Sequence, residues 1–122
     1  MNPAPPGSPG PPVFESDRLP GIVGDAPLIR ETLGLFLVDA PGQLLQIEAA
    51  ARGGDGPPLD VAAHKFKGSA LQIGGIALAE ACQALVTLHH PATSPLATRL
   101  ARLRAEHVRL REAVEAYLAV AP

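Results

Sequence analysis

The sequence predicts an all-α protein, an up-down antiparallel four-helix bundle, and three observations support this. Apolar residues recur at three- and four-residue steps in four separate segments, and no segment shows the alternation that is typical of a strand. Aromatic residues make up only 3% of the chain, so the core must consist mainly of Leu, Ala, Val and Ile, which suits closely packed helices. A length of 122 residues leaves room for one core and a tail.

The tail is the N-terminal segment, residues 1–14. Residues 1–12 are almost entirely Pro, Gly, Ala and Ser, a composition that has little to bury and favours extended, polyproline-like conformations. We therefore expect a linker or a disordered tail; a proline-motif ligand for a partner domain is the alternative. The helical domain is expected to span residues 15–122, with a short helical turn around residues 16–19 that covers one end of the bundle.

The first long helix is expected to begin after Asp25, a residue type that caps helix N-termini, with Pro27 in the first turn. Pro41 lies inside the run and should kink or briefly break the helix, so we expect one bent helix or two nearly collinear helices. Glycines at 53, 54 and 56 end the element. The apolar positions that keep helical phase throughout are Ile29, Leu33, Phe36, Leu37, Ala40, Leu44, Ile47 and Ala51.

The second helix is expected to run from Pro57 to about Ile73. Its apolar stripe is led by Phe66, and at about 100° per residue a second group falls well away from that stripe. This second group contains His64, Lys67, Gly68 and Leu71, so His64 should face water. The stripe itself consists of Leu59, Ala63, Phe66, Ala70 and Ile73.

The third and fourth helices complete the bundle. Gly74 and Gly75 separate the second helix from the third, which is expected to bury Leu78, Ala81, Cys82, Leu85 and Leu88. The last helix carries a packing seam at alternating steps of four and three: Leu96, Leu100, Leu103, His107, Leu110, Val114 and Tyr117. Arginines including Arg99, Arg102 and Arg111 alternate with glutamates on what we expect to be its solvated outer face.

Composition and charge exclude several classes of function. The formal net charge of −2 offers no electrostatic footprint for nucleic acid. The single cysteine, Cys82, favours a reducing, cytoplasmic setting, and no apolar run is long enough to span a bilayer. The spacings of the histidines, Cys82 and the acidic residues match neither a structural zinc site nor a di-metal bundle site, so we expect no metal.

His64, Lys67 and Gly68 together suit the chemistry of an anion. Residues three and four apart are neighbours on a helix surface, roughly 5–6 Å apart at Cβ, so Lys67 can reach an anion held on the ring of His64. Gly68 leaves open space beside that ring. Because glycine in mid-helix costs about 1 kcal/mol relative to alanine, close approach by another molecule is a reason to tolerate it.

These residues resemble the signature of histidine-containing phosphotransfer (Hpt) domains, the phosphorelay modules of two-component signalling. In that signature a His is followed by Lys-Gly-Ser, then by a hydrophobic residue and Gly, and then by leucines and often a Cys at helical spacing. The likeness covers roughly residues 17–120. The matching positions here are His64, Lys67, Gly68, Ser69, Ile73, Gly74, Gly75, Leu78, Cys82 and Leu85.

One position departs from the family pattern. Many members carry Glu or Gln at the end of the Cys-x-x-Leu segment, where the side chain can hydrogen-bond the far ring nitrogen of the phosphoaccepting His. This chain has Val86 at that position. Gln83, one turn earlier, is the candidate to orient the imidazole in its place.

The resemblance implies a phosphocarrier in which His64 accepts a phosphoryl group from a receiver-domain aspartate and passes it to another receiver aspartate. Lys67 would stabilise the phosphoryl group. Docking is expected on the helix surface around His64, and the residues expected for access and partner docking are Gly68, Ser69, Leu71 and Gln72. The receiver would supply Mg²⁺, and this domain would bind no cofactor.

The same resemblance indicates the setting of the domain. The sequence contains no glycine-rich phosphate loop, so we expect a phosphotransfer intermediate rather than an independent enzyme. The expected partners are response-regulator receivers and a hybrid sensor histidine kinase, of which this domain would be the C-terminal module. We expect a cytoplasmic domain, which can belong to a membrane-anchored kinase, with no membrane contact of its own.

Two other classes stay open at this point. One is a helical adaptor that binds receiver or kinase domains without being phosphorylated, which the apolar Val86 favours. The other is the dimerisation and phosphoacceptor domain of a kinase, which needs a dimeric four-helix arrangement and an adjoining ATPase domain. Because the chain supplies four helices of its own, we expect a monomer.

Overall fold

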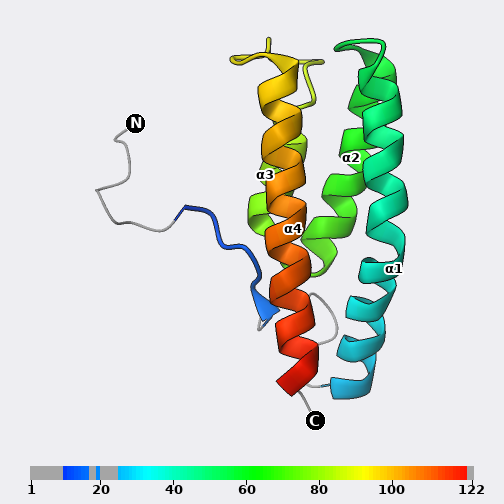
Figure 1. Cartoon of the computed structure of the whole chain (residues 1–122), viewed down its shortest axis with the longest axis vertical. Helices are drawn as coiled ribbons and strands as arrows, with labels where there is room; N and C mark the ends of the chain where they lie inside the picture. Colours follow the sequence, from blue (N-terminus) through cyan, green and yellow to red (C-terminus); the bar gives the residue numbers. More distant parts are fainter. Residues whose placement is uncertain (1–9, 17–18, 20–24, 121–122) are drawn as a thin grey trace.

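The computed structural model describes residues 10–16, 19 and 25–120, and it confirms an all-α bundle. Successive helices run up and down, and each packs against two others: α1 and α3 both contact α2 and α4 (Figure 1). The described residues include no strand and no helix that is long and apolar enough to cross a bilayer. The four helices are α1 (Ala26–Ala51), α2 (Pro57–Gln72), α3 (Ile76–Gln83) and α4 (Leu96–Val120).

Helix α1 begins where the sequence predicts. The carboxylate of Asp25 accepts a hydrogen bond from the backbone N–H of Leu28 at 3.0 Å and so caps the helix, with Pro27 in the first turn. The helix then continues through Pro41 as one element. Proline removes one backbone donor, but buried Ala40 and Ile47 lie on either side of it and hold both halves of α1 against the same core.

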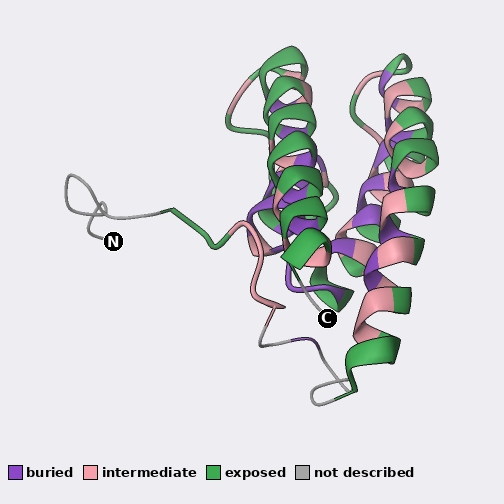
Figure 2. Ribbon diagram, turned by 60° about the horizontal axis from the view of Figure 1, so that its bottom comes forward, coloured by how far each residue is buried: buried purple, intermediate pink, exposed green. Residues whose placement is uncertain are grey.

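The centre of the core is an aromatic group around Phe66, whose side chain is fully buried. The rings of Phe66 and Phe36 are stacked with centroids 6.4 Å apart, and the ring of His107 lies 6.1 Å from that of Phe66 at a tilt of 56°. Leu and Ala fill most of the remaining interior, as the aromatic-poor composition predicts. Buried residues line the inner sides of the helices while the outer sides are exposed (Figure 2).

The N-terminal segment is attached to the turn between α2 and α3. The backbone N–H of Glu15 donates to the carbonyl of Gly74, and that of Ala77 donates to the carbonyl of Pro12, both at 2.9 Å. Phe14 meets Tyr117 edge-to-face with ring centroids 5.7 Å apart. Most of the predicted linker, residues 1–9, lies outside the described residues, but its end from position 12 onward packs on the bundle.

The predicted helical turn at residues 16–19 is only partly described. Ser16 lies in a 3₁₀ turn and Leu19 is completely buried, whereas residues 17–18 are outside the described part of the chain. The burial of Leu19 agrees with a segment that covers one end of the bundle.

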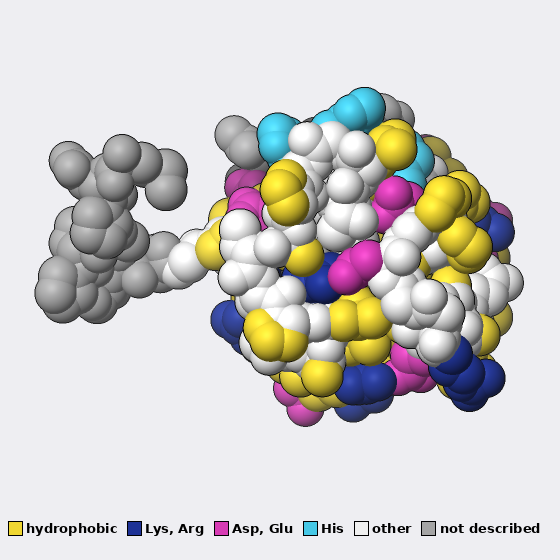
Figure 3. Space-filling model, turned by 90° about the horizontal axis from the view of Figure 1, so that it is seen from above, with side chains coloured by type: hydrophobic (Ala, Val, Ile, Leu, Met, Phe, Trp, Pro, Cys, Tyr) yellow, Lys and Arg dark blue, Asp and Glu magenta, His cyan; other side chains and the backbone are white. Residues whose placement is uncertain are grey.

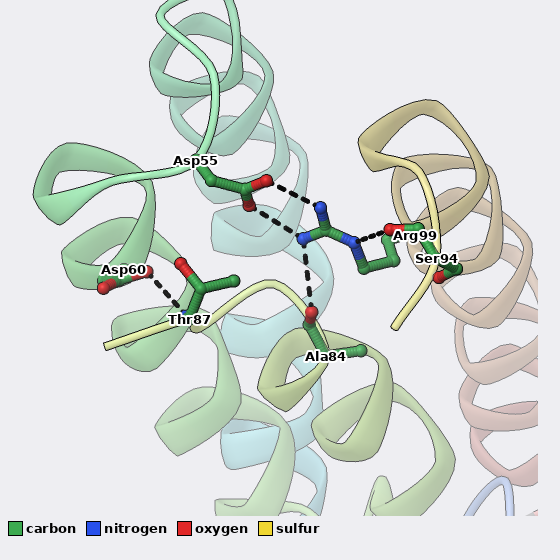
Figure 4. Close-up of polar contacts among 6 residues, drawn as sticks. All are labelled: Asp55, Asp60, Ala84, Thr87, Ser94 and Arg99. Atoms are coloured by element: carbon green, nitrogen blue, oxygen red, sulfur yellow. Dashed lines mark hydrogen bonds and ion pairs between the residues drawn. The ribbon is translucent and has the colours of Figure 1, made fainter. Parts of the chain in front are cut away.

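The expected burial of Leu88 in the third helix is wrong. Helix α3 ends at Gln83, and Leu88 is 68% exposed, although Leu78, Ala81, Cys82 and Leu85 are buried as predicted. Hydrogen bonds from outside α3 explain the early end: Arg99 donates to the carbonyl of Ala84 at 3.3 Å, and Asp60 accepts from the N–H of Thr87 at 3.1 Å (Figure 4). Backbone groups that would extend α3 are thus used by other elements.

The placement of Arg99 on the outer face of the last helix is also wrong. Its side chain is buried and forms a two-pronged ion pair with Asp55, at 2.9 and 2.8 Å (Figure 4). It also donates to the carbonyl of Ser94 at 2.9 Å. This pair holds the pKa of Asp55 below its ordinary value, because the carboxylate accepts hydrogen bonds from the guanidinium. Arg99 therefore joins the α1–α2 loop, the end of α3 and the start of α4.

A first prediction concerns Gly74. Its φ of 79° is unfavourable for any side chain, and a Cβ there would lie 2.5 Å from the carbonyl oxygen of Glu15. We expect Gly74→Ala to lower the free energy of unfolding by about 1–3 kcal/mol, measured by urea denaturation. The matched control is Gly68→Ala in mid-helix, where a Cβ meets nothing within 4 Å; it should raise stability by up to about 1 kcal/mol. Equal effects of the two changes would contradict the requirement for glycine at position 74.

A second prediction concerns pH. Burial, and next the positive charge of Arg111, lower the pKa of His107. The unfolded chain, with an ordinary His pKa of about 6.5, then binds a proton more readily than the folded chain. The stability that this difference represents is present above pH ~6.5 and is lost as the pH falls below it. In denaturation series between pH 7.5 and 5.5, His107→Leu should flatten the decline; an unchanged slope would contradict the assignment.

Candidate functional site

His64 lies on the outer side of α2, as its position in the helical pattern predicts. Its neighbours Ala63 and Phe66 are completely buried, whereas His64 itself is exposed. Because the buried stripe fixes the rotation of α2 about its axis, the imidazole is held toward solvent without needing a contact of its own.

A surface hollow surrounds His64, and Lys67 and Gln83 both line it. The ammonium of the half-buried Lys67 donates a hydrogen bond of 2.7 Å to the side-chain oxygen of Gln83 on α3. The charge of Lys67 also acts on the buried thiol of Cys82. Burial raises the pKa of Cys82 to about 12, and the positive charge of Lys67 acts in the opposite direction. Lys67 therefore leans across the groove between α2 and α3, one turn from His64.

Gln83 and Val86 occupy the positions that bear on how the imidazole is oriented. The oxygen of Gln83 is the expected partner of His64, but in this structure it accepts from Lys67. Val86 is half-buried and forms an apolar part of the same hollow. In the structure Gln83 therefore holds the ammonium of Lys67. Its predicted role in orienting the imidazole of His64 remains a prediction.

Gly68 and Leu71 continue the exposed face of α2 below His64. Gly68 is exposed, and a Cβ at this position would meet nothing within 4 Å, so packing inside the chain does not require a glycine. Leu71 is 41% exposed. These two residues leave room for another molecule beside the imidazole.

Ser69 and Gln72 lie on a different side of α2, toward α1. The Ser69 hydroxyl is within hydrogen-bond distance of the Gln43 side-chain oxygen, at 3.2 Å, and of the Lys65 carbonyl, at 3.4 Å. A second hollow between the two helices contains both predicted residues, and its lining is Thr32, Leu35, Phe36, Asp39, Gln43, Ser69, Gln72 and Ile73. The predicted docking residues therefore do not form one site: Ser69 and Gln72 line the hollow toward α1, whereas Gly68 and Leu71 lie on the exposed face of α2.

Sequence reasoning did not assign four residues to the His64 hollow: Asp60, Val61, Leu88 and His89. Asp60 lies one turn before His64 on α2, and helical spacing was a signal that could have found it. Leu88 and His89 reach the hollow only because α3 stops at Gln83, and no pattern in the sequence announces that early end. Across the described ranges, no group of three His, Cys, Asp or Glu side chains is placed to hold a metal ion.

The geometry defines a helical bundle that presents one accessible imidazole, with a positioned ammonium close by, on an open surface rather than in an enclosed pocket. Such a site can carry a group on the imidazole and can be reached by a large partner. The family model for the Hpt domain matches residues 31–119, more than half of the chain, and the chain belongs to this family. No curated protein and no solved structure matches the chain.

Membership confirms the resemblance seen in the sequence and gives a coarse function. Hpt domains carry phosphoryl groups in two-component phosphorelays and interact with the receiver domains of response regulators. They are phosphocarriers and not catalytic enzymes.

Proposed function

We propose that His64 is the phosphoacceptor: it takes a phosphoryl group from the aspartate of one receiver domain and passes it to the aspartate of another. The observation that carries this proposal is the exposure of His64 in a hollow that it shares with the ammonium of Lys67. We further propose that the domain works in the cytoplasm as the C-terminal module of a hybrid sensor histidine kinase, which can be membrane-anchored.

The chemistry needs little from this chain. An unprotonated ring nitrogen of His64 attacks the phosphorus of the aspartyl phosphate; a nitrogen–phosphorus bond forms, and the bond to the aspartate oxygen breaks with release of the carboxylate. The second ring nitrogen keeps its proton, so the ring is positive until that proton passes to water. The reverse step delivers the group to the next receiver. Positioning and charge neutralisation dominate such transfers, and we expect the receiver to supply Mg²⁺.

Lys67 supplies the charge neutralisation on this side. An ammonium has three N–H donors, so Lys67 can keep its bond to Gln83 and still donate to a phosphoryl oxygen on His64. Gln83 limits the rotamers of a long side chain, and less entropy is then lost when the phosphoryl group arrives. Gln83 is therefore a positioning residue for the cation.

The receiver would approach over Gly68 and Leu71, which leave space and a small apolar contact beside the imidazole. An adaptor that binds receivers without phosphorylation is the second candidate function, favoured by Val86 at a position that is usually polar in the family. A monomer suffices for either function.

The decisive test is phosphorylation of the purified domain. After incubation with a phosphorylated receiver and Mg²⁺, wild type should carry acid-labile, base-stable label, and His64→Gln should carry none. His90→Gln serves as a matched control, because His90 is an exposed histidine that does not line the His64 hollow; it should be labelled like wild type. Receivers that bind wild type yet leave it unlabelled would favour the adaptor.

The Lys67–Gln83 pair gives a quantitative prediction for the rate of phosphotransfer. Loss of a charge-assisted hydrogen bond is worth about 1.5–3 kcal/mol, so Lys67→Ala should slow phosphotransfer by about 10- to 100-fold, measured by rapid-quench kinetics. Gln83→Ala should slow it less, by about two- to tenfold, and should have no further effect when Lys67 is already Ala.

The control is Glu80→Ala, an exposed change one turn earlier on α3 that does not line the His64 hollow. It should transfer at the wild-type rate. Additive effects of the Lys67 and Gln83 changes would contradict the positioning role, because two independent residues add in free energy.

A further inference from the structure

Opposite α2, the wall of the His64 hollow is formed by Gln83 at the end of α3 and mainly by the irregular segment that follows it. Beyond the end of α3, Val86, Leu88 and His89 all line the hollow that contains His64 and Lys67. Two of these three side chains are aliphatic. His89 is the one that can form hydrogen bonds, and it is exposed.

Contacts from two helices, α2 and α4, hold this segment in place. The carboxylate of Asp60 on α2 accepts from the backbone N–H of Thr87 at 3.1 Å. Buried Arg99 on α4 donates to the carbonyl of Ala84 at 3.3 Å while its ion pair with Asp55 fixes the guanidinium (Figure 4). Residues 84–87 are thus attached on both sides, and His89 follows two residues after the second attachment.

The charges around the hollow leave a phosphoryl group incompletely neutralised. Lys65 and Lys67 are its cations and Asp60 is its anion. A phosphoryl group carries a charge of about −1.5 to −2 near neutral pH, so its arrival on His64 gives the hollow a net negative charge. An additional donor or cation at the rim would therefore be favourable, and Val86 supplies neither.

The geometry points to His89 as a second phosphoryl-binding residue, one that donates a ring N–H to a phosphoryl oxygen carried on His64. An imidazole has at least one N–H donor in either charge state, and two when it is protonated. The inference rests on the proposed function of His64. It means that the segment after α3 helps to stabilise the phosphorylated form of the domain.

The neighbouring histidine provides a contrast within the same segment. His90 lines a different hollow, together with Glu80, Pro91 and Thr93, and not the one around His64. Because His107 is buried, the histidines at the described surface are His64, His89 and His90. Histidine side chains gather along one edge of the bundle end where α4 begins (Figure 3).

The test measures how long the phosphoryl group stays on His64. The full chain is phosphorylated with phosphoramidate, a small donor that needs no docking, and loss of label is followed at neutral pH without any receiver. Loss of one hydrogen bond corresponds to about a two- to tenfold change, so His89→Ala should shorten the half-life of the phosphohistidine by that factor. His89→Gln, which keeps an N–H donor, should restore part of it, and His90→Ala should leave it unchanged.

A spectroscopic readout separates a direct contact from a loss of packing. In NMR spectra of wild type, phosphorylation should shift the ring resonances of His89 more than those of His90. A wild-type half-life in His89→Ala, or equal shifts of the two rings, would overturn the inference while leaving His64 as phosphoacceptor. If phosphoramidate puts no label on His64 in wild type, the proposed function and this inference both fail.

Discussion

The burial of Phe66 is the constraint on which the rest of the site depends. Its ring packs against both Phe36 on α1 and His107 on α4, so α2 cannot rotate about its axis without exposing an aromatic side chain. Exposing it would cost about 1.5–3 kcal/mol. Two residues earlier in the helix, His64 is turned to solvent by the same constraint. The imidazole is therefore oriented by packing on the opposite side of α2, and among the described residues it makes no hydrogen bond that a phosphoryl group would have to displace.

The hollow around His64 is assembled by two different physical means. The buried apolar stripe of α2 fixes the rotation of this helix about its axis. This rotation places Asp60, His64 and Lys67 along the side that lines the hollow. Hydrogen bonds, and the ion pair of buried Arg99 with Asp55, set the opposing wall, because the chain from Ala84 to Thr87 has little regular structure of its own. Because groups outside this segment hold its backbone, its side chains can be substituted without repacking the core.

The sequence predicted the features that depend on periodicity. The four helices, the buried Phe66, the exposed His64 and the capping of α1 by Asp25 all follow from local spacing and residue type. It did not predict the early end of α3 or the burial of Arg99, because both result from contacts between elements far apart in the chain. In the sequence Arg99 is one of several arginines on a helix and is therefore expected to face solvent. Its burial becomes evident only when the loop that carries its partner Asp55 is located beside it.

The position of Cys82 has a consequence for the conditions in which the domain can work. Its thiol is fully buried, and this burial raises its pKa to about 12, so the thiol stays protonated at neutral pH. Oxidants and electrophiles react with the thiolate, and here they find almost none. The only cysteine in the chain therefore contributes to packing, and its burial and protonation make it a poor target for oxidants.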